Sequence, residues 1–246
     1  MLIQQGSGRS EAIDLRLACT LAGVAGSLNA AAFYAVGFFS ANMTGNVSTL
    51  SVDAATGHWQ KGLFYLTILL AFVTGAGIST TIINAGQRRD MSRIYALTVL
   101  LEAVLLIILG GADLWLSGQW RVPTVVLGLS FIMGLQNAMI TKLSGAEIRT
   151  THMTGIVTDI GIELGKLFYW NSSRGGPAEP VVLANRAKLK VHGTMLVMFF
   201  VGGVTGALGF KHIGYAATIP LAGLLIVLAI VPLIDDLRDQ VYRLDR

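Results

Sequence analysis

The residues of this sequence best suited to chemistry gather in two short polar segments, each built around a Met-Thr-Gly triplet. Amide, hydroxyl and imidazole groups can bind a small solute through hydrogen bonds. The first backbone amides of a helix carry partial positive charge, which suits an anion. We therefore expect the two segments to line a substrate pathway, with Asn42, Thr44, Gly45, Asn46, Thr151, His152, Thr154 and Gly155 as the candidate residues.

Each triplet predicts the beginning of a short helix. Thr44 and Thr154 are expected as N-caps, because a threonine hydroxyl can accept a hydrogen bond from a first-turn amide. Gly45 and Gly155 would allow another group to approach the backbone closely. The structural alternative is that each Thr-Gly pair is a packing contact or a kink, with no solute involved.

Three further polar residues stand inside long apolar stretches and join the candidates for the pathway. Glu102 has no charged neighbour in the sequence, so it predicts either proton coupling or a buried structural carboxylate. Asn29 and Asn137 are either pathway residues or hydrogen-bonding links between helices. Asp159, Glu163 and Lys166 have the spacing of an ion pair within one helix.

Motifs of known enzymes are missing. The sequence has no Gly-x-Ser-x-Gly, no His-Glu-x-x-His and no phosphate-binding Gly-Lys-Ser/Thr. Cys19 is the one cysteine, which excludes a disulfide framework and a cysteine-based metal site. We therefore expect no enzyme, no catalytic residue, no metal and no cofactor.

Composition predicts a membrane protein of the all-α class. Of the 246 residues, 53% are apolar and 13% are charged, whereas a soluble domain carries about 25% charged residues. A membrane-spanning helix needs roughly 20 mostly apolar residues. Six stretches meet this requirement, at about 14–37, 62–86, 94–116, 122–141, 191–210 and 213–234. The net charge of +4 resides in short loops, so we expect the lipid bilayer as partner and no nucleic acid.

Three sequence matches in the same order indicate an internal duplication within a single membrane domain, 1–246. They predict one repeat at 13–117 and a second at 122–234, each with a Met-Thr-Gly half-helix. The matches are Gly26-Ser27-Leu28-Asn29-Ala30 with Gly134-Leu135-Gln136-Asn137-Ala138, Asn42-Met43-Thr44-Gly45 with His152-Met153-Thr154-Gly155, and Val73-Thr74-Gly75-Ala76 with Val204-Thr205-Gly206-Ala207.

The distribution of Lys and Arg predicts the topology. If the polar segments 40–57 and 149–168 do not cross, fifteen basic residues lie inside and three outside; if both cross, the division is twelve and six. The positive-inside rule favours the first case, with six crossings and both termini cytoplasmic. Three crossings per half would give the halves opposite orientations, which is the inverted repeat typical of many transporters.

The paired Thr-Gly elements resemble those of the YoaK-like family of bacterial membrane proteins, catalogued as domain of unknown function 1275. The resemblance rests on Phe38 to Asn46, Gly134 to Ala138 and Thr150 to Gly155, and extends from about Ile13 to Ile234. It implies a multi-pass protein of about six helices in the bacterial inner membrane. It implies no substrate. His152 departs from the family's second element, where a small or aliphatic residue is expected.

Two functions from different classes remain open at this stage. The first is a small secondary transporter or permease for a small, anionic solute. The second is a membrane scaffold or sensor that transports nothing and in which the repeats are only architectural. A water-accessible cavity at the Thr-Gly elements would favour the first, and dry burial would favour the second. The sequence leaves the oligomeric state open.

Overall fold

The computed structural model describes residues 11–89, 91, 94–144, 150–169 and 182–230. Within these ranges the chain contains helices and no strand, which confirms the all-α prediction. The basic chain ends and most of the 170–190 loop, which carry much of the predicted inside charge, lie outside the described residues.

Eight α-helices are bounded within the described ranges, and each polar triplet begins a short one of its own. Two 3-10 turns, η2 (Gly118–Trp120) and η3 (Gly214–Ala217), follow α5 and α8, and residues 218–230 are helical again. The helices are α1 (Glu11–Val36), α2 (Met43–Ala55), α3 (Trp59–Gln87), α4 (Ile94–Gly110), α5 (Ala112–Trp115), α6 (Arg121–Leu143), α7 (Met153–Phe168) and α8 (Arg186–Ile213).

Four helical stretches in the described part of the chain are long and apolar enough to cross a membrane. They are Leu17–Ala35, Trp59–Gln87, Gly118–Leu143 and Arg186–Ile230. The last is 45 residues long and contains α8, η3 and residues 218–230, while α4 is a shorter apolar helix of 17 residues. The lengths and hydropathy of these helices confirm a polytopic membrane bundle, because lipid requires each spanning backbone to satisfy its own hydrogen bonds.

The two halves of the chain exchange partners in the centre of the bundle: α1 packs along α8, and α3 packs along α6. A methyl group on Gly26 of α1 would overlap the carbonyl oxygen of Phe199 in α8. One on Gly134 of α6 would overlap the carbonyl oxygen of Phe72 in α3. Glycine therefore lets each pair of helices approach backbone to backbone, as small residues do in membrane proteins.

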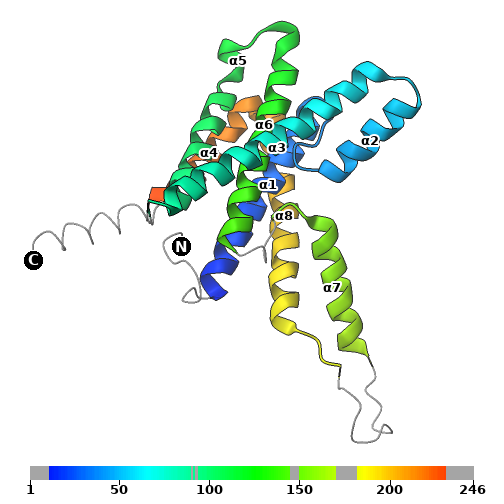
Figure 1. The fold of residues 1–246 in the computed structure, drawn as a ribbon, viewed down its shortest axis with the longest axis vertical. Helices are drawn as coiled ribbons and strands as arrows, with labels where there is room; N and C mark the ends of the chain where they lie inside the picture. Colours follow the sequence, from blue (N-terminus) through cyan, green and yellow to red (C-terminus); the bar gives the residue numbers. More distant parts are fainter. Residues whose placement is uncertain (1–10, 90, 92–93, 145–149, 170–181, 231–246) are drawn as a thin grey trace, which may run out of the picture.

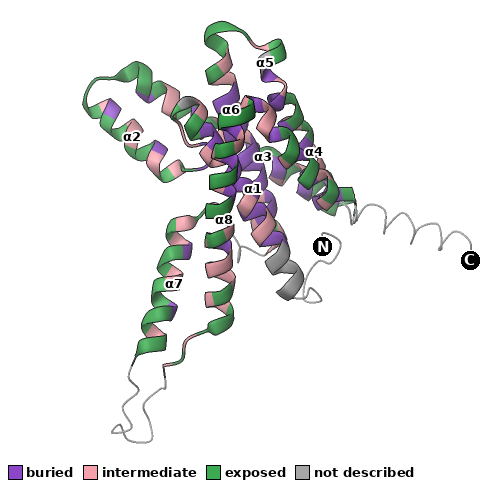
Figure 2. Ribbon diagram, turned by 180° about the vertical axis from the view of Figure 1, so that it is seen from behind, coloured by how far each residue is buried: buried purple, intermediate pink, exposed green. Residues whose placement is uncertain are grey.

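Two separate helical arms project from this centre. One arm is α2 packed against α3, and the other is α7 packed against α8 (Figure 1). Buried residues gather on α1 and α6, whereas α2 and α7 are largely exposed (Figure 2). The half-helices therefore attach to the bundle mainly at their N-terminal ends and along one face.

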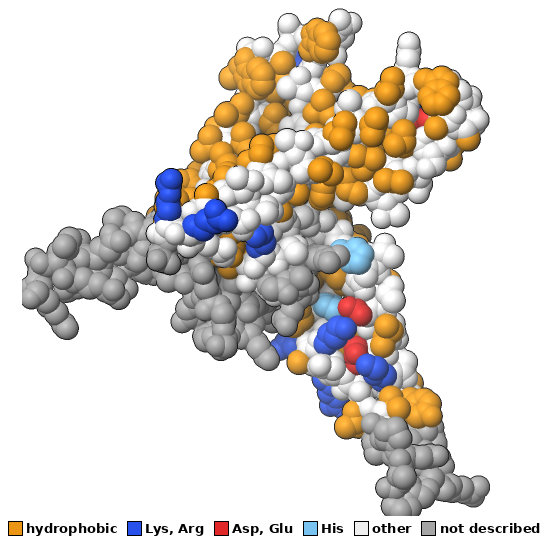
Figure 3. Space-filling view, viewed as in Figure 1, with side chains coloured by type: hydrophobic (Ala, Val, Ile, Leu, Met, Phe, Trp, Pro, Cys, Tyr) orange, Lys and Arg blue, Asp and Glu red, His pale blue; other side chains and the backbone are white. Residues whose placement is uncertain are grey.

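Large apolar side chains cover the outside of the bundle. Val73 and Phe200 are 64% and 69% exposed. Hydrophobic side chains spread over the part built from α2 to α5, while charged side chains gather on the α7–α8 arm (Figure 3). An apolar exterior suits lipid, which needs no polar surface.

Candidate functional site

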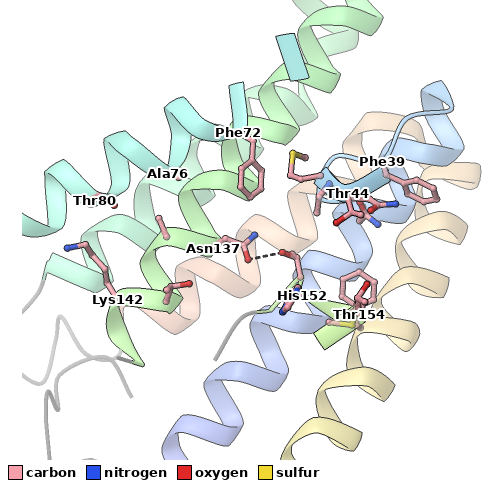
Figure 4. A pocket seen from close by; sticks show the side chains of 18 residues that line it. Phe39, Thr44, Phe72, Ala76, Thr80, Asn137, Lys142, His152 and Thr154 are labelled. Atoms are coloured by element: carbon pink, nitrogen blue, oxygen red, sulfur yellow. Dashed lines mark hydrogen bonds between the residues drawn. The ribbon is translucent and has the colours of Figure 1, made fainter. Parts of the chain in front are cut away.

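A cavity of about 810 Å³ lies where the two arms meet the bundle (Figure 4). Ligand sites typically have volumes of about 300–1,000 Å³. Its walls combine polar side chains with three phenylalanines from different parts of the chain. The lining residues are Asn29, Phe39, Ala41, Asn42, Met43, Thr44, Phe72, Ala76, Thr80, Asn137, Ala138, Thr141, Lys142, Thr151, His152, Met153, Thr154 and Phe199.

The cavity brings together most of the residues that the sequence predicted for a pathway. Members of both Met-Thr-Gly segments lie on its walls, although more than a hundred residues separate them in the chain. Of the predicted residues, Asn29, Asn42, Thr44, Asn137, Thr151, His152 and Thr154 line it. Gly45, Asn46 and Gly155 lie directly behind that lining on α2 and α7, whereas Glu102 lies on α4 and does not line it.

Asn29 and Asn137 attach the two half-helices to the bundle in matching ways. The side-chain carbonyl of Asn29 accepts a 2.9 Å hydrogen bond from the backbone amide of Ala41. The side-chain carbonyl of Asn137 accepts a 2.8 Å hydrogen bond from the Thr151 hydroxyl (Figure 4). Ala41 and Thr151 each stand two positions before the methionine of their triplet. Both asparagines therefore fix the segment that leads into a half-helix.

The prediction that Thr44 and Thr154 are N-caps is wrong. Helix α2 begins at Met43, and its N-cap is Asn42, whose side-chain oxygen accepts a 3.1 Å hydrogen bond from the amide of Gly45. Helix α7 begins at Met153 with His152 as N-cap, and that side chain makes no capping bond. At α2 the helix begins earlier than predicted because Asn42, two residues before Thr44, is among the strongest N-caps.

The glycine of each triplet leaves room for the side chain of the cap. A methyl group on Gly45 would overlap the amide group of Asn42, and one on Gly155 would overlap the ring of His152. The side chains of Asn42 and His152 therefore fold back over the first turn of their helices. This contact is the close approach predicted for the two glycines, and it is made by the cap.

Asn46 stabilises the loop that precedes the first half-helix, α2. It is 4% exposed, and its amide nitrogen donates a 3.3 Å hydrogen bond to the carbonyl oxygen of Phe39. The bond closes the loop that leads from α1 into α2. Asn46 is therefore a structural support for the cavity wall.

The ionisable groups on the cavity wall are basic. Lys142 and His152 line it, and none of the eighteen lining residues is Asp or Glu. The ammonium nitrogen of Lys142 donates a 2.5 Å hydrogen bond to the side-chain oxygen of Asn84. Lys142 lies at the other end of the cavity from Thr44 and Thr154 (Figure 4).

Sequence reasoning missed Lys142. It is the one charged residue within α6 past its first position, and it follows Asn137 by five residues. Because Lys142 stands at the end of an apolar stretch, the count of Lys and Arg on each side of the membrane included it only as one more cytoplasmic charge. The missed signal was its position: Lys142 shares α6 with the cavity residues Asn137, Ala138 and Thr141.

The acidic residues near the half-helices occupy the far ends of the arms. Glu163 is 3% exposed and accepts hydrogen bonds from the Lys166 ammonium at 2.9 Å and the Asn185 backbone amide at 2.6 Å. These two bonds hold the pKa of Glu163 below its usual range. The predicted pairing along α7 is confirmed for Glu163 and Lys166. Asp159 instead pairs across to α8, with Lys188 at 3.2 Å and His192 at 3.5 Å.

Asp53 occupies the matching position on the first arm. It is 8% exposed, and one of its carboxylate oxygens lies 3.8 Å from Nδ1 of His58, the residue that precedes α3. Each half-helix thus ends with a buried carboxylate beside the start of the next long helix. In the described part of the chain, no group of three or more His, Cys, Asp or Glu side chains is placed to hold a metal ion.

Comparison with known proteins gives a family model and a transmembrane relative. The family described as "Protein of unknown function (DUF1275)" matches residues 17–231. A curated relative, the "UPF0700 transmembrane protein YoaK" of Bacillus subtilis (strain 168), is 26% identical over 157 residues, which cover 63% of this chain and 68% of the relative. No solved structure matches the chain.

Proposed function

The chain belongs to the family described as "Protein of unknown function (DUF1275)", so its activity has to be inferred from the site, and we propose that it is a small secondary transporter or permease for a small anionic solute. It is a membrane protein, as its helices and its transmembrane relative indicate. The solute would bind in the cavity between the half-helices.

One observation carries this proposal: the N-terminal ends of α2 and α7 open into the same cavity. These helices have 13 and 16 residues, and Asn29 and Asn137 hold the segments before them. Broken helices whose ends meet at a central site are a recurrent feature of transporters. Non-helical backbone at membrane depth is either buried in protein or lines water. A scaffold could bury these segments dry, whereas a transporter needs a polar cavity there.

The charge of the cavity wall supports an anion as the solute. Lys142 contributes a full positive charge, and His152 adds a second group that can carry one. The first-turn amides of α2 and α7 add partial positive charge from the opposite end. With no carboxylate among the lining residues, the cavity would favour a carboxylate or oxyanion over a cation.

The packing of the bundle supports six crossings and an inverted repeat. In this arrangement α1, α3 and α4 of the first half correspond to α6, α8 and residues 218–230 of the second. The exchanged pairs, α1 with α8 and α3 with α6, are what a two-fold relation between the halves would produce.

The contacts of the glycines refine the repeat. Gly75 of α3 crosses α6 at Phe131, and Gly202 of α8 crosses α1 at Gly23. Gly75 therefore corresponds to Gly202, one helical turn before the Gly206 of the sequence match. With the predicted charge distribution, we place both termini in the cytoplasm and the protein in the bacterial inner membrane.

The test is solvent accessibility of the cavity in the intact protein. With Cys19 replaced by Ser, single cysteines at Thr44 and Thr154 are treated with a charged, membrane-impermeant thiol reagent from each side of oriented vesicles. We expect Thr44→Cys to react from outside and Thr154→Cys from inside, with Ala32→Cys, which is buried, as the unreactive control. If both cavity cysteines stay unreactive while Lys61→Cys labels, the cavity is dry and the transporter proposal is wrong.

The anion is tested by protection of the same cysteines. We expect acetate or sulfate to slow labelling of Thr154→Cys, with choline having no effect. Adding Lys142→Met should remove the protection, whereas adding Lys61→Met, which removes the same charge far from the cavity, should leave it. Equal protection by choline, or protection that survives Lys142→Met, would contradict an anionic solute bound at this site.

A further inference from the structure

Among the fully buried polar side chains that have no hydrogen-bond partner in the described part of the chain, two carry more than a hydroxyl group. Glu102, in the middle of α4, and Gln136, on α6, are both 0% exposed. Neither carboxylate oxygen of Glu102 and neither amide atom of Gln136 makes a hydrogen bond. Burying such groups without partners is costly for an amide and far more costly for a charge. A pair of this kind therefore points to a function.

The register of the two helices brings Glu102 and Gln136 to the same depth. Helices α4 and α6 form an antiparallel hairpin, joined by the short stretch that contains α5 and η2. At one end a methyl group on Gly128 would lie 2.9 Å from the Leu109 side chain, so these two positions face each other. Glu102 is seven residues before Leu109 and Gln136 is eight after Gly128, which is two turns along each helix.

Among the described residues, the surroundings of Glu102 supply no counter-charge. Helix α4 packs against α3, α5, α6, η3 and the start of 218–230. The charged and titratable side chains that are described on these elements stand near helix ends or beyond them, and none is paired with Glu102; they are Lys61, Tyr65, Arg88, Arg89, Tyr95, Arg121, Lys142 and Tyr215. Among them Tyr95 accepts a hydrogen bond from Gln87, and Lys142 is bound to Asn84.

An ionised Glu102 would thus be a bare charge in the membrane interior, which is costly. A neutral carboxylic acid presents a donor and an acceptor side by side, and so does the edge of a primary amide that carries its C=O and one N–H. The acid O–H can donate to Oε1 of Gln136 while the acid carbonyl accepts from Nε2. Protonation therefore makes the two unpartnered groups complementary.

We propose that Glu102 and Gln136 form a proton-binding site between α4 and α6, and that its occupancy is coupled to the solute cavity through α6. Gln136 and Asn137 are consecutive, so they point about 100° apart on the helix. Gln136 is fully buried beside the hairpin, and Asn137 lines the cavity and holds Thr151. Loss of the proton would leave an unpaired charge in the α4–α6 contact and favour a state in which α6 moves. The coupling, though not the proton site itself, rests on the proposed transport function.

The proton site is tested by infrared difference spectroscopy of the full-length protein in lipid vesicles. At neutral pH we expect a carboxylic-acid C=O band that is absent in Glu102→Gln and shifted in Glu102→Asp. It should move to higher frequency in Gln136→Leu, because its hydrogen bond is lost. Glu163→Gln is the matched control, since Glu163 is paired with Lys166 and Asn185 and should contribute only a carboxylate band. A carboxylate band from Glu102 at neutral pH would overturn the proposal.

The coupling is tested with acetate and sulfate, which keep one protonation state near neutral pH. Their protection of Thr154→Cys should vary between neutral and alkaline pH and become independent of pH when Glu102→Gln is added, with protection itself retained. Protection that does not vary with pH in the presence of Glu102 would overturn the coupling and leave the cavity intact. An acid band from Glu102 with no protection by either anion would instead count against the anion cavity and leave the proton site standing.

Discussion

Asn137 accepts a 2.8 Å hydrogen bond from the hydroxyl of Thr151 and so ties the middle of α6 to the segment that begins α7. Asn29 does the same for α2 through the amide of Ala41. The donor to Asn137 is a side-chain hydroxyl, whereas the donor to Asn29 is a backbone amide. The Asn137–Thr151 link can therefore be removed from both sides by substitution.

A double-mutant cycle on this pair should show coupling. We expect Asn137→Leu and Thr151→Val each to destabilise the protein, and the double variant to lose less than the sum by about 0.5–1.5 kcal/mol. Thermal unfolding in detergent gives the four stabilities. Strict additivity would mean that the bond contributes nothing to the fold.

The close crossing of α6 and α3 at Gly134 predicts that a single added methyl group lowers stability strongly. Gly134→Ala should cost about 1–3 kcal/mol, because the methyl group meets the backbone carbonyl of Phe72, which cannot rotate away. Gly77→Ala in α3 is the control, since no atom lies within 4 Å of the added methyl group. The readout is the apparent Tm, and equal shifts for the two variants would contradict the crossing.

The N-cap position of α7, where no side chain bonds the first-turn amides, predicts a stabilising substitution. His152 makes no capping bond, whereas Asn42 at the start of α2 caps the amide of Gly45. His152→Asn should therefore raise stability by about 0.5–1 kcal/mol. Asn42→His is the reciprocal change and should lower it. A fall in Tm for His152→Asn would show that the ring has a role that the amide cannot replace.

The pairing of Glu163 predicts a dependence of stability on pH. Because the folded state lowers the pKa of this carboxyl, its contribution is complete above the usual pKa of glutamate, about 4.3, and disappears as pH falls through the lower folded value. Glu163→Gln should be less stable than the parent at neutral pH, and the difference should shrink in acid. Chemical unfolding at several pH values measures it; a constant difference would remove the ionic explanation.

The repeated motifs of the sequence pointed to residues that the structure places around one cavity. Asn29 and Asn137 occupy matching positions in two repeated motifs, as do Thr44 and Thr154. All four residues line the same cavity. The caps were misassigned because Thr and Asn are both good N-caps and only the backbone angles decide between them.

The pairing of helices was beyond the sequence. Periodicity indicates which face of a helix is buried, and it does not say which helix covers that face. The shift between Gly206 and Gly202 has the same origin, because a run rich in small residues fits more than one register. Lys142 was missed for a related reason, since a lysine at the end of a span is usually only a topology signal.

The exchange of partners between halves also constrains the biosynthesis of the protein. The hydrogen bond from Ser27 to the carbonyl of Gly202 joins residues 175 positions apart. At roughly 5–20 residues per second of synthesis, α1 waits about 10–35 s in the bilayer before α8 arrives. Neither α1 nor α6 meets its main partner within its own half. A ribosome that stalls between the two halves would therefore leave two unmatched glycine-lined helices in the membrane, open to association with other proteins there.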